Sequence, residues 1–136
     1  MFAILSRLES VLADLPGDRL LRLRGPYSAT EIKAVCRHFD FVMTGRMHLM
    51  IAAFGMGVPA VGVDYQGKFS GLITHFGLSE ENLISPSEIC GDEALYAFIS
   101  RRFLDRAATG RQLREALPSV LAKAELNFSE PCEWPS

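Results

Sequence analysis

The amino-acid sequence predicts an α/β domain with a Rossmann-like layered arrangement and a mostly parallel sheet. Stretches with apolar residues every three or four positions alternate with short, fully apolar runs, a pattern typical of helices and of strands buried on both faces. The chain has 136 residues, of which 49% are hydrophobic and 22% are charged, and this excludes a disordered chain. We expect one domain over residues 1–126 and an irregular tail over residues 127–136.

The first part of the chain predicts two helices separated by a short strand. Residues 2–15 have the apolar stripe of an amphipathic helix, which ends at Pro16. Residues 20–23 are expected to form the strand. Ser28 and Glu31 have the spacing of a capping box, in which the serine oxygen accepts from a free amide and the glutamate reaches back. A second helix is therefore expected to begin here.

The middle of the chain predicts buried strands over residues 41–43 and 58–63. The intervening helix, residues 47–54, is almost entirely apolar, so we expect it to be buried on most sides. A fourth helix is expected over residues 69–76, with Gly77 at its C′ position. These segments alternate as they do in parallel sheets that have helices on both faces.

The last part of the chain predicts a short strand at residues 83–84 and helical stripes over residues 95–103 and 113–124. The last helix is expected to kink at Pro118. No internal repeat and no linker divides the sequence. Because the expected sheet has an open edge and some apolar surface is left uncovered, we also expect a homo-oligomer.

Composition limits the partners and the compartment. The net charge is −2, so there is no overall attraction to nucleic acid. The three cysteines have no CxxC spacing, which favours a reducing compartment, and no apolar run is long enough to span a membrane. We expect a cytoplasmic protein, with the inner face of the membrane as an alternative. No metal motif, GxSxG, GxGxxG or Walker A loop is present, and we expect no cofactor or metal.

Two polar loops follow the central strands and carry the candidate site. In parallel sheets, ligands bind beyond the carboxyl ends of the strands. The loops at these ends are residues 44–48 and 64–68. Arg46 and His48 stand at the start of a helix, where a cation opposes the helix dipole and a bound anion would resolve the conflict. The alternative is that Arg46 pairs with a surface carboxylate and that His48 is a half-buried, hydrogen-bonded side chain.

Other basic residues have structural interpretations. His38 and His75 stand near expected helix C-termini, where a cationic histidine is favourable without any function. The remaining arginines recur along the last helices and are interpreted as a solvated face; they are Arg101, Arg102, Arg106, Arg111 and Arg114.

The residues after the first central strand resemble a known family. Residues 41–48 end in Gly-Arg-Met-His, residues 57–63 read Gly-Val-Pro-Ala-Val-Gly-Val, and Tyr65 and Lys68 follow. Over residues 27–83 the chain resembles the C-terminal, GT-B-like donor half of the polysaccharide pyruvyl transferase family. The specific part is Gly-Arg-x-His with Tyr-x-x-Lys, because the helix, Gly-Val-Pro and strand are shared with other GT-B enzymes.

The resemblance implies an enzyme that transfers the enolpyruvyl unit of phosphoenolpyruvate onto two hydroxyls of a sugar, forming a ketal and releasing phosphate. The acceptor would be a surface glycan or a lipid-linked sugar. The resemblance places Gly45, Arg46, His48, Tyr65 and Lys68 at the substrate site. Arg46 and Lys68 would stabilise the donor's anionic groups and the departing phosphate, and His48 would be the general acid.

The family's enzymes also have an N-terminal half. The chain begins at an expected helix, so we expect that half and the first strand of the donor half to be absent, and the isolated chain to be inactive. A fragment, an engineered piece and a reduced natural relative all remain open, and the acceptor sugar is not indicated. Two other functions also remain open: the C-terminal half of a nucleotide-sugar glycosyltransferase, and a noncatalytic binding or assembly module.

Overall fold

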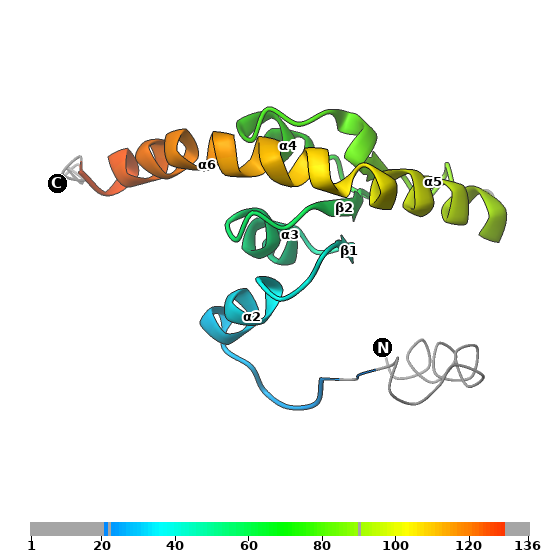
Figure 1. The fold of residues 1–136 in the computed structure, drawn as a ribbon, viewed down its shortest axis with the longest axis horizontal. Helices are drawn as coiled ribbons and strands as arrows, with labels where there is room; N and C mark the ends of the chain where they lie inside the picture. Colours follow the sequence, from blue (N-terminus) through cyan, green and yellow to red (C-terminus); the bar gives the residue numbers. More distant parts are fainter. Residues whose placement is uncertain (1–20, 22, 90, 130–136) are drawn as a thin grey trace, which may run out of the picture.

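The structure is a computed structural model that describes residues 21, 23–89 and 91–129. Its sheet has three strands in the order β1-β2-β3, and both pairings are parallel. The strands are β1 (Val42–Thr44), β2 (Ala60–Val63) and β3 (Leu83–Ile84). Helices precede, separate and follow them (Figure 1). The prediction of an α/β domain with a parallel, Rossmann-like sheet is confirmed. The helix expected over residues 2–15 lies outside the described residues.

The strand predicted at residues 20–23 is not found at the positions that the structure describes. Leu21 and Leu23 have no strand conformation, and they are 84% and 46% exposed. The third strand of the sheet is instead β3, which pairs Gly62 with Leu83. An apolar run favours a strand only where a neighbouring strand accepts its backbone hydrogen bonds, and β1 pairs only with β2 among the described strands.

One face of the sheet carries the hydrophobic core. Helices α3 (Met47–Phe54) and α4 (Ser70–His75) follow β1 and β2, and their buried side chains cluster with Val42 and Ala60. Right-handed crossovers between parallel strands taken in this order place both helices on the same face. The cluster also includes Leu113 from the last helix. The predicted bounds of the α3 helix, residues 47–54, are confirmed.

The opposite face is covered only in part. Neighbouring residues of a strand point to opposite faces, so Met43, Val61 and Ile84 share this second face. Val61 and Ile84 are buried, whereas Met43 is 40% exposed. We expected helices on both faces of the sheet. In the described part of the chain, the β1 edge of this second face is left uncovered.

Side chains pack closely on the backbone of β2 at Gly62. A Cβ atom at Gly62 would lie 2.9 Å from Cδ2 of Leu83 and 3.0 Å from Cδ1 of Phe69, so these side chains would have to shift for a larger residue. After α4, Gly77 has a φ of +64°, and the amide of Leu78 donates to the carbonyl of Ile73 at 3.0 Å. This is the helix ending predicted for Gly77.

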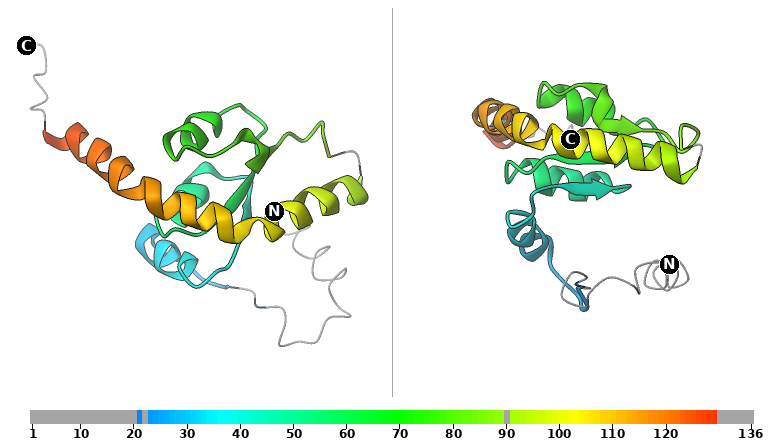
Figure 2. Two further views of the ribbon diagram at one scale, coloured as in Figure 1. Left: turned by 45° about the horizontal axis from the view of Figure 1, so that its top comes forward. Right: turned by 45° about the vertical axis from the view of Figure 1, so that its right-hand side comes forward.

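The last two helices follow each other along one side of the domain. A 3₁₀ turn (Glu80–Asn82) leads into β3, and α5 (Asp92–Leu104) and α6 (Arg106–Ser129) come next. Figures 1 and 2 show α6 on the opposite side of the domain from α2 (Ala29–Cys36), with its C-terminal part extending beyond the other elements. The α6 helix continues through Pro118.

The irregular tail predicted from residue 127 is wrong at its start, because α6 continues to Ser129. Prolines at positions 131 and 135 suggested an earlier end, but a proline prevents helix only near its own position. Residues 130–136 lie outside the described residues.

Helix α2 begins at the predicted capping box. The amide of Glu31 donates to Oγ of Ser28 at 3.2 Å, and the amide of Ser28 donates to Oε2 of Glu31 at 2.8 Å. The amide of Ser28 and its hydroxyl, which also donates to Oε2 at 2.8 Å, lower the pKa of the Glu31 carboxyl, and the slight desolvation of the side chain opposes them. The position of α2 matters for the site, because α2 packs against α3.

Replacing Ser28 with alanine is expected to lower the free energy of unfolding by about 1 kcal/mol, the usual contribution of an N-cap side chain. The lowered pKa of Glu31 means that its carboxylate stabilises the fold above its ordinary pKa of 4.5, and that this stabilisation is lost as the pH falls below it. Urea unfolding at pH 7 and at pH 4 measures both effects.

The matched control is Ser119→Ala, because Ser119 is exposed on α6. It should change the stability by less than about 0.5 kcal/mol. Equal losses in Ser28→Ala and Ser119→Ala would contradict a capping role for Ser28.

Candidate functional site

A pocket of about 760 Å³ lies beyond the carboxyl ends of β1 and β2. Three parts of the chain form it: positions within the first six residues of α3 with the two residues before them, the loop after β2, and the beginning of α2 with Tyr27 before it. Every predicted substrate-site residue lines this pocket, namely Gly45, Arg46, His48, Tyr65 and Lys68. The fold thus brings the two polar loops, which are separated in the sequence by α3 and β2, to one place.

Thr44 fixes the backbone of the first loop. This last residue of β1 is 7% exposed. Its Oγ1 accepts from the amide of Arg46 at 2.9 Å and donates to the carbonyl of Arg46 at 3.2 Å. Both polar groups of the Arg46 backbone are therefore held, while Arg46 itself is the N-cap of α3 and its side chain makes no capping bond. The side chain is left available for a ligand.

Asp64 fixes the second loop. Its Oδ1 accepts from the amides of Gln66 and Lys68 at 3.1 and 3.3 Å, and its Oδ2 accepts from the amide of Phe69 at 3.4 Å. Gly67, inside this loop, has a φ of +65°, a conformation that other residues rarely adopt. The carboxylate therefore shapes the loop that presents Tyr65 and Lys68.

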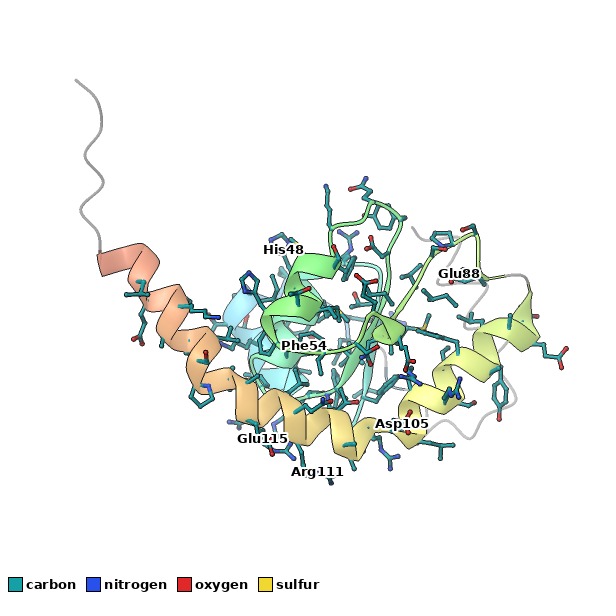
Figure 3. The ribbon with its side chains drawn as sticks, turned by 90° about the horizontal axis from the view of Figure 1, so that it is seen from above. His48, Phe54, Glu88, Asp105, Arg111 and Glu115 are labelled. Atoms are coloured by element: carbon teal, nitrogen blue, oxygen red, sulfur yellow. The ribbon has the colours of Figure 1, made fainter. Side chains whose placement is uncertain are left out.

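Helix α3 divides the pocket from the core. Met50, Ala53 and Phe54 are buried, whereas the helix positions that line the pocket are Met47, His48, Leu49, Ile51 and Ala52. Figure 3 shows His48 on the side of the domain away from Arg111 and Glu115 of α6, with Phe54 between them. One face of this short helix thus packs in the core, and its other positions line the pocket.

The pocket gathers basic side chains that have no acidic partner among the described residues. Within the described part of the chain, the side chains of Arg46, His48 and Lys68 make no hydrogen bond or ion pair. The carboxylate of Asp64 is the acidic group among the lining residues, and it is engaged with backbone amides. Arg46 and His48 stand at the positive end of the α3 dipole and Lys68 lines the same pocket, an arrangement that favours a bound anion.

The described residues do not show the alternative interpretation of Arg46 and His48. His48 is exposed rather than half-buried and hydrogen-bonded, and Arg46 pairs with no carboxylate among the described residues. Two basic residues therefore still stand at the N-terminus of α3, where a positive side chain opposes the helix dipole.

Tyr27 and Lys33 also line the pocket, and the sequence did not identify them. Both come from the beginning of α2 or the residues before it, far in the sequence from the polar loops. Ala29, Ile32 and Lys33 share one face of α2 at helical spacing, and that face lies in the pocket. This periodicity was visible in the sequence, but the packing of α2 on α3 was not.

The basic residues given structural interpretations lie outside this pocket. His38 follows α2 and accepts a hydrogen bond from Nε of Arg37 at 3.2 Å, and His75 ends α4. Arg102 is not a solvated side chain: it is 12% exposed and pairs with Glu81 at 2.9 Å and with Asp105 at 3.3 Å. Arg106 stacks on the ring of Phe103.

Neither a metal cluster nor a membrane span is found in the parts that the structure describes. Residues 21, 23–89 and 91–129 contain no group of three or more histidine, cysteine or acidic side chains that could hold a metal. None of the described helices is long and apolar enough to cross a membrane. Cys36 is a buried free thiol, and desolvation raises its pKa.

One comparison with known proteins gives a match to a family model. Residues 3–67 match the family model described as polysaccharide pyruvyl transferase. The match includes Gly45, Arg46, His48 and Tyr65 and ends one residue before Lys68. The match thus begins before the resemblance described over residues 27–83, and it does not include residues 68–83 of that resemblance. No curated protein and no solved structure gives a significant match.

Proposed function

We propose that this chain is a member of the polysaccharide pyruvyl transferase family, whose model residues 3–67 match, and that its pocket is the donor site for phosphoenolpyruvate. The observation that carries the proposal is the convergence of Arg46, His48 and Lys68 on one pocket without partners among the described residues. Phosphoenolpyruvate carries a phosphate and a carboxylate, and such groups bind well to a planar guanidinium and an ammonium.

His48 is proposed as the general acid. It protonates the methylene carbon of phosphoenolpyruvate, which makes C2 electrophilic and turns C3 into a methyl group. One sugar hydroxyl adds to C2 and loses its proton, and the C2–O bond to phosphate breaks. A second hydroxyl of the same sugar then adds and loses its proton, which closes the ketal. Arg46 and Lys68 stabilise the negative charge on the departing phosphate.

The supporting residues keep these groups in place. Thr44 holds the backbone of Arg46 and Asp64 holds the amide of Lys68, so both cations stand on fixed backbone. Tyr65 lines the same pocket, and a Cβ atom at Gly45 would lie 3.9 Å from the carbonyl oxygen of Val63, so Gly45 stands close to the end of β2. The acceptor is proposed to be a sugar of a surface glycan or of a lipid-linked precursor.

Removing either pocket cation is expected to weaken the binding of phosphoenolpyruvate. A hydrogen bond to a charged group contributes about 1.5–3 kcal/mol, so Arg46→Ala and Lys68→Ala should each raise the Kd about tenfold or more. Calorimetric titration of phosphoenolpyruvate into the chain measures this effect.

Lys123→Ala serves as the control, since Lys123 is an exposed lysine of α6 outside the pocket. Its Kd should stay within twofold of the wild type. If Arg46→Ala and Lys68→Ala bind phosphoenolpyruvate as tightly as this control does, the pocket is not the donor site.

A further inference from the structure

The pocket continues along α3 beyond the donor residues. Its second part is a groove lined by one face of α2 and one face of α3, and we refer to it as the α2–α3 groove; it consists of Tyr27, Ala29, Ile32, Lys33, Ile51 and Ala52. Pockets of about 300–1,000 Å³ hold drug-sized ligands, and the 760 Å³ pocket exceeds what a three-carbon donor occupies. A donor bound at Arg46 therefore leaves the α2–α3 groove free.

Lys33 marks the far end of this groove. Its Nζ lies 3.7 Å from the position that a Cβ atom would have at Gly55, which is the C-cap of α3. Arg46 is the N-cap of the same helix, and eight helical residues separate the two caps, a length of about 12 Å. The ammonium of Lys33 thus belongs to the other end of α3 from the donor residues and is too distant to share one small anion with them.

The α2–α3 groove combines apolar surface with one cation. Tyr27 and Ile51 are 42% and 43% exposed, and the hydroxyl of Tyr27 donates to the carbonyl of Arg24 at 3.0 Å. An anchored aromatic ring and an isoleucine offer apolar surface to the C–H faces of a sugar ring. Within the described residues Lys33 has no hydrogen bond or ion pair, so its ammonium is available for an anionic group.

We propose that the α2–α3 groove is an acceptor subsite and that it binds a hexose carrying a phosphate. The proposal rests on the proposed donor site, because the sugar hydroxyls must reach C2 of the donor and the groove is continuous with that site. The sugar ring lies against Tyr27 and Ile51, and its phosphate lies at Lys33. The donor half thus contributes directly to acceptor recognition.

The test is calorimetric titration of glucose 1-phosphate into the whole chain saturated with phosphoenolpyruvate. Glucose 1-phosphate is expected to bind without displacing the donor and at least about tenfold more tightly than glucose, which lacks the anion. Lys33→Ala should remove this preference while leaving the Kd for phosphoenolpyruvate within twofold. Lys123→Ala is the matched control and should change neither Kd.

The subsite proposal is wrong if glucose 1-phosphate competes with phosphoenolpyruvate, or if Lys33→Ala keeps the preference for glucose 1-phosphate over glucose. It is also wrong if the chain forms a dimer that covers the groove and prevents sugar binding, and if Ile51→Glu dissociates that dimer. If phosphoenolpyruvate itself does not bind, the proposed donor site fails. The groove is then tested separately by titrating glucose 1-phosphate alone into the wild type and Lys33→Ala, and a Lys33-dependent Kd would still support the subsite.

Discussion

Replacing Phe54 with alanine is expected to lower the free energy of unfolding by about 3–5 kcal/mol, the usual cost of removing a buried aromatic ring. Phe54 is fully buried, and its ring lies 5.2 Å from the ring of Phe76, centroid to centroid, in an edge-on contact. The contact joins α3 to the end of α4. The cavity left by the alanine would loosen the helix that presents Arg46 and His48.

Urea unfolding with an unchanged m value measures this loss. Ile51→Ala is the matched control, because Ile51 lies on the same helix and is 43% exposed, and it should cost clearly less. If Phe54→Ala does not fold, Phe54→Leu retains most of the buried area and should lose less stability than the alanine variant. A loss in Phe54→Leu no larger than that in Ile51→Ala would contradict the central position of this ring.

Replacing His48 with asparagine is expected to slow turnover by about 100-fold or more, the usual contribution of a general acid. Asparagine can donate a hydrogen bond but cannot deliver a proton to carbon. Because Arg46 and Lys68 carry the binding, the Kd for phosphoenolpyruvate should change less than threefold. Phosphate release from phosphoenolpyruvate measures turnover, with methyl glucoside, galactoside and mannoside as acceptors and with the longest natural chain that contains these residues as the enzyme.

His75→Asn is the control, since His75 is an exposed histidine at the end of α4 and outside the pocket. It should turn over like the wild type. The role of His48 as the acid would be rejected if His48→Asn retained its rate, or if its Kd rose as much as that of Arg46→Ala.

Local rules in the sequence predicted several elements because those elements depend on neighbouring residues. The capping box of Ser28 and Glu31 gave the start of α2, and Gly77 gave the end of α4. The apolar run of α3, followed by Gly55 and Gly57, predicted its bounds. The strand at residues 20–23 was wrong at its described positions, because pairing depends on distant backbone that an apolar run does not specify.

The sequence predicted the candidate site only through the rule that ligands bind at the carboxyl ends of parallel strands. That rule placed the loops of Arg46 and Lys68 at one sheet edge, and both loops line the pocket. The contributions of Tyr27 and Lys33 depend on the packing of α2 against α3, a tertiary contact that no spacing in the sequence encodes. Thr44 and Asp64 were visible as polar residues, but their hydrogen bonds to the loops were not.

The most direct test of the account is one phosphorus NMR titration in which the chain is added to an equimolar mixture of phosphoenolpyruvate and uridine diphosphate. A donor site for phosphoenolpyruvate predicts that its phosphorus resonance shifts or broadens while the nucleotide resonances stay unchanged. The Arg46→Ala variant should give a clearly smaller change in the phosphoenolpyruvate resonance at the same concentration. A shift of the nucleotide resonances without any change in phosphoenolpyruvate would contradict the account and favour a nucleotide-sugar glycosyltransferase.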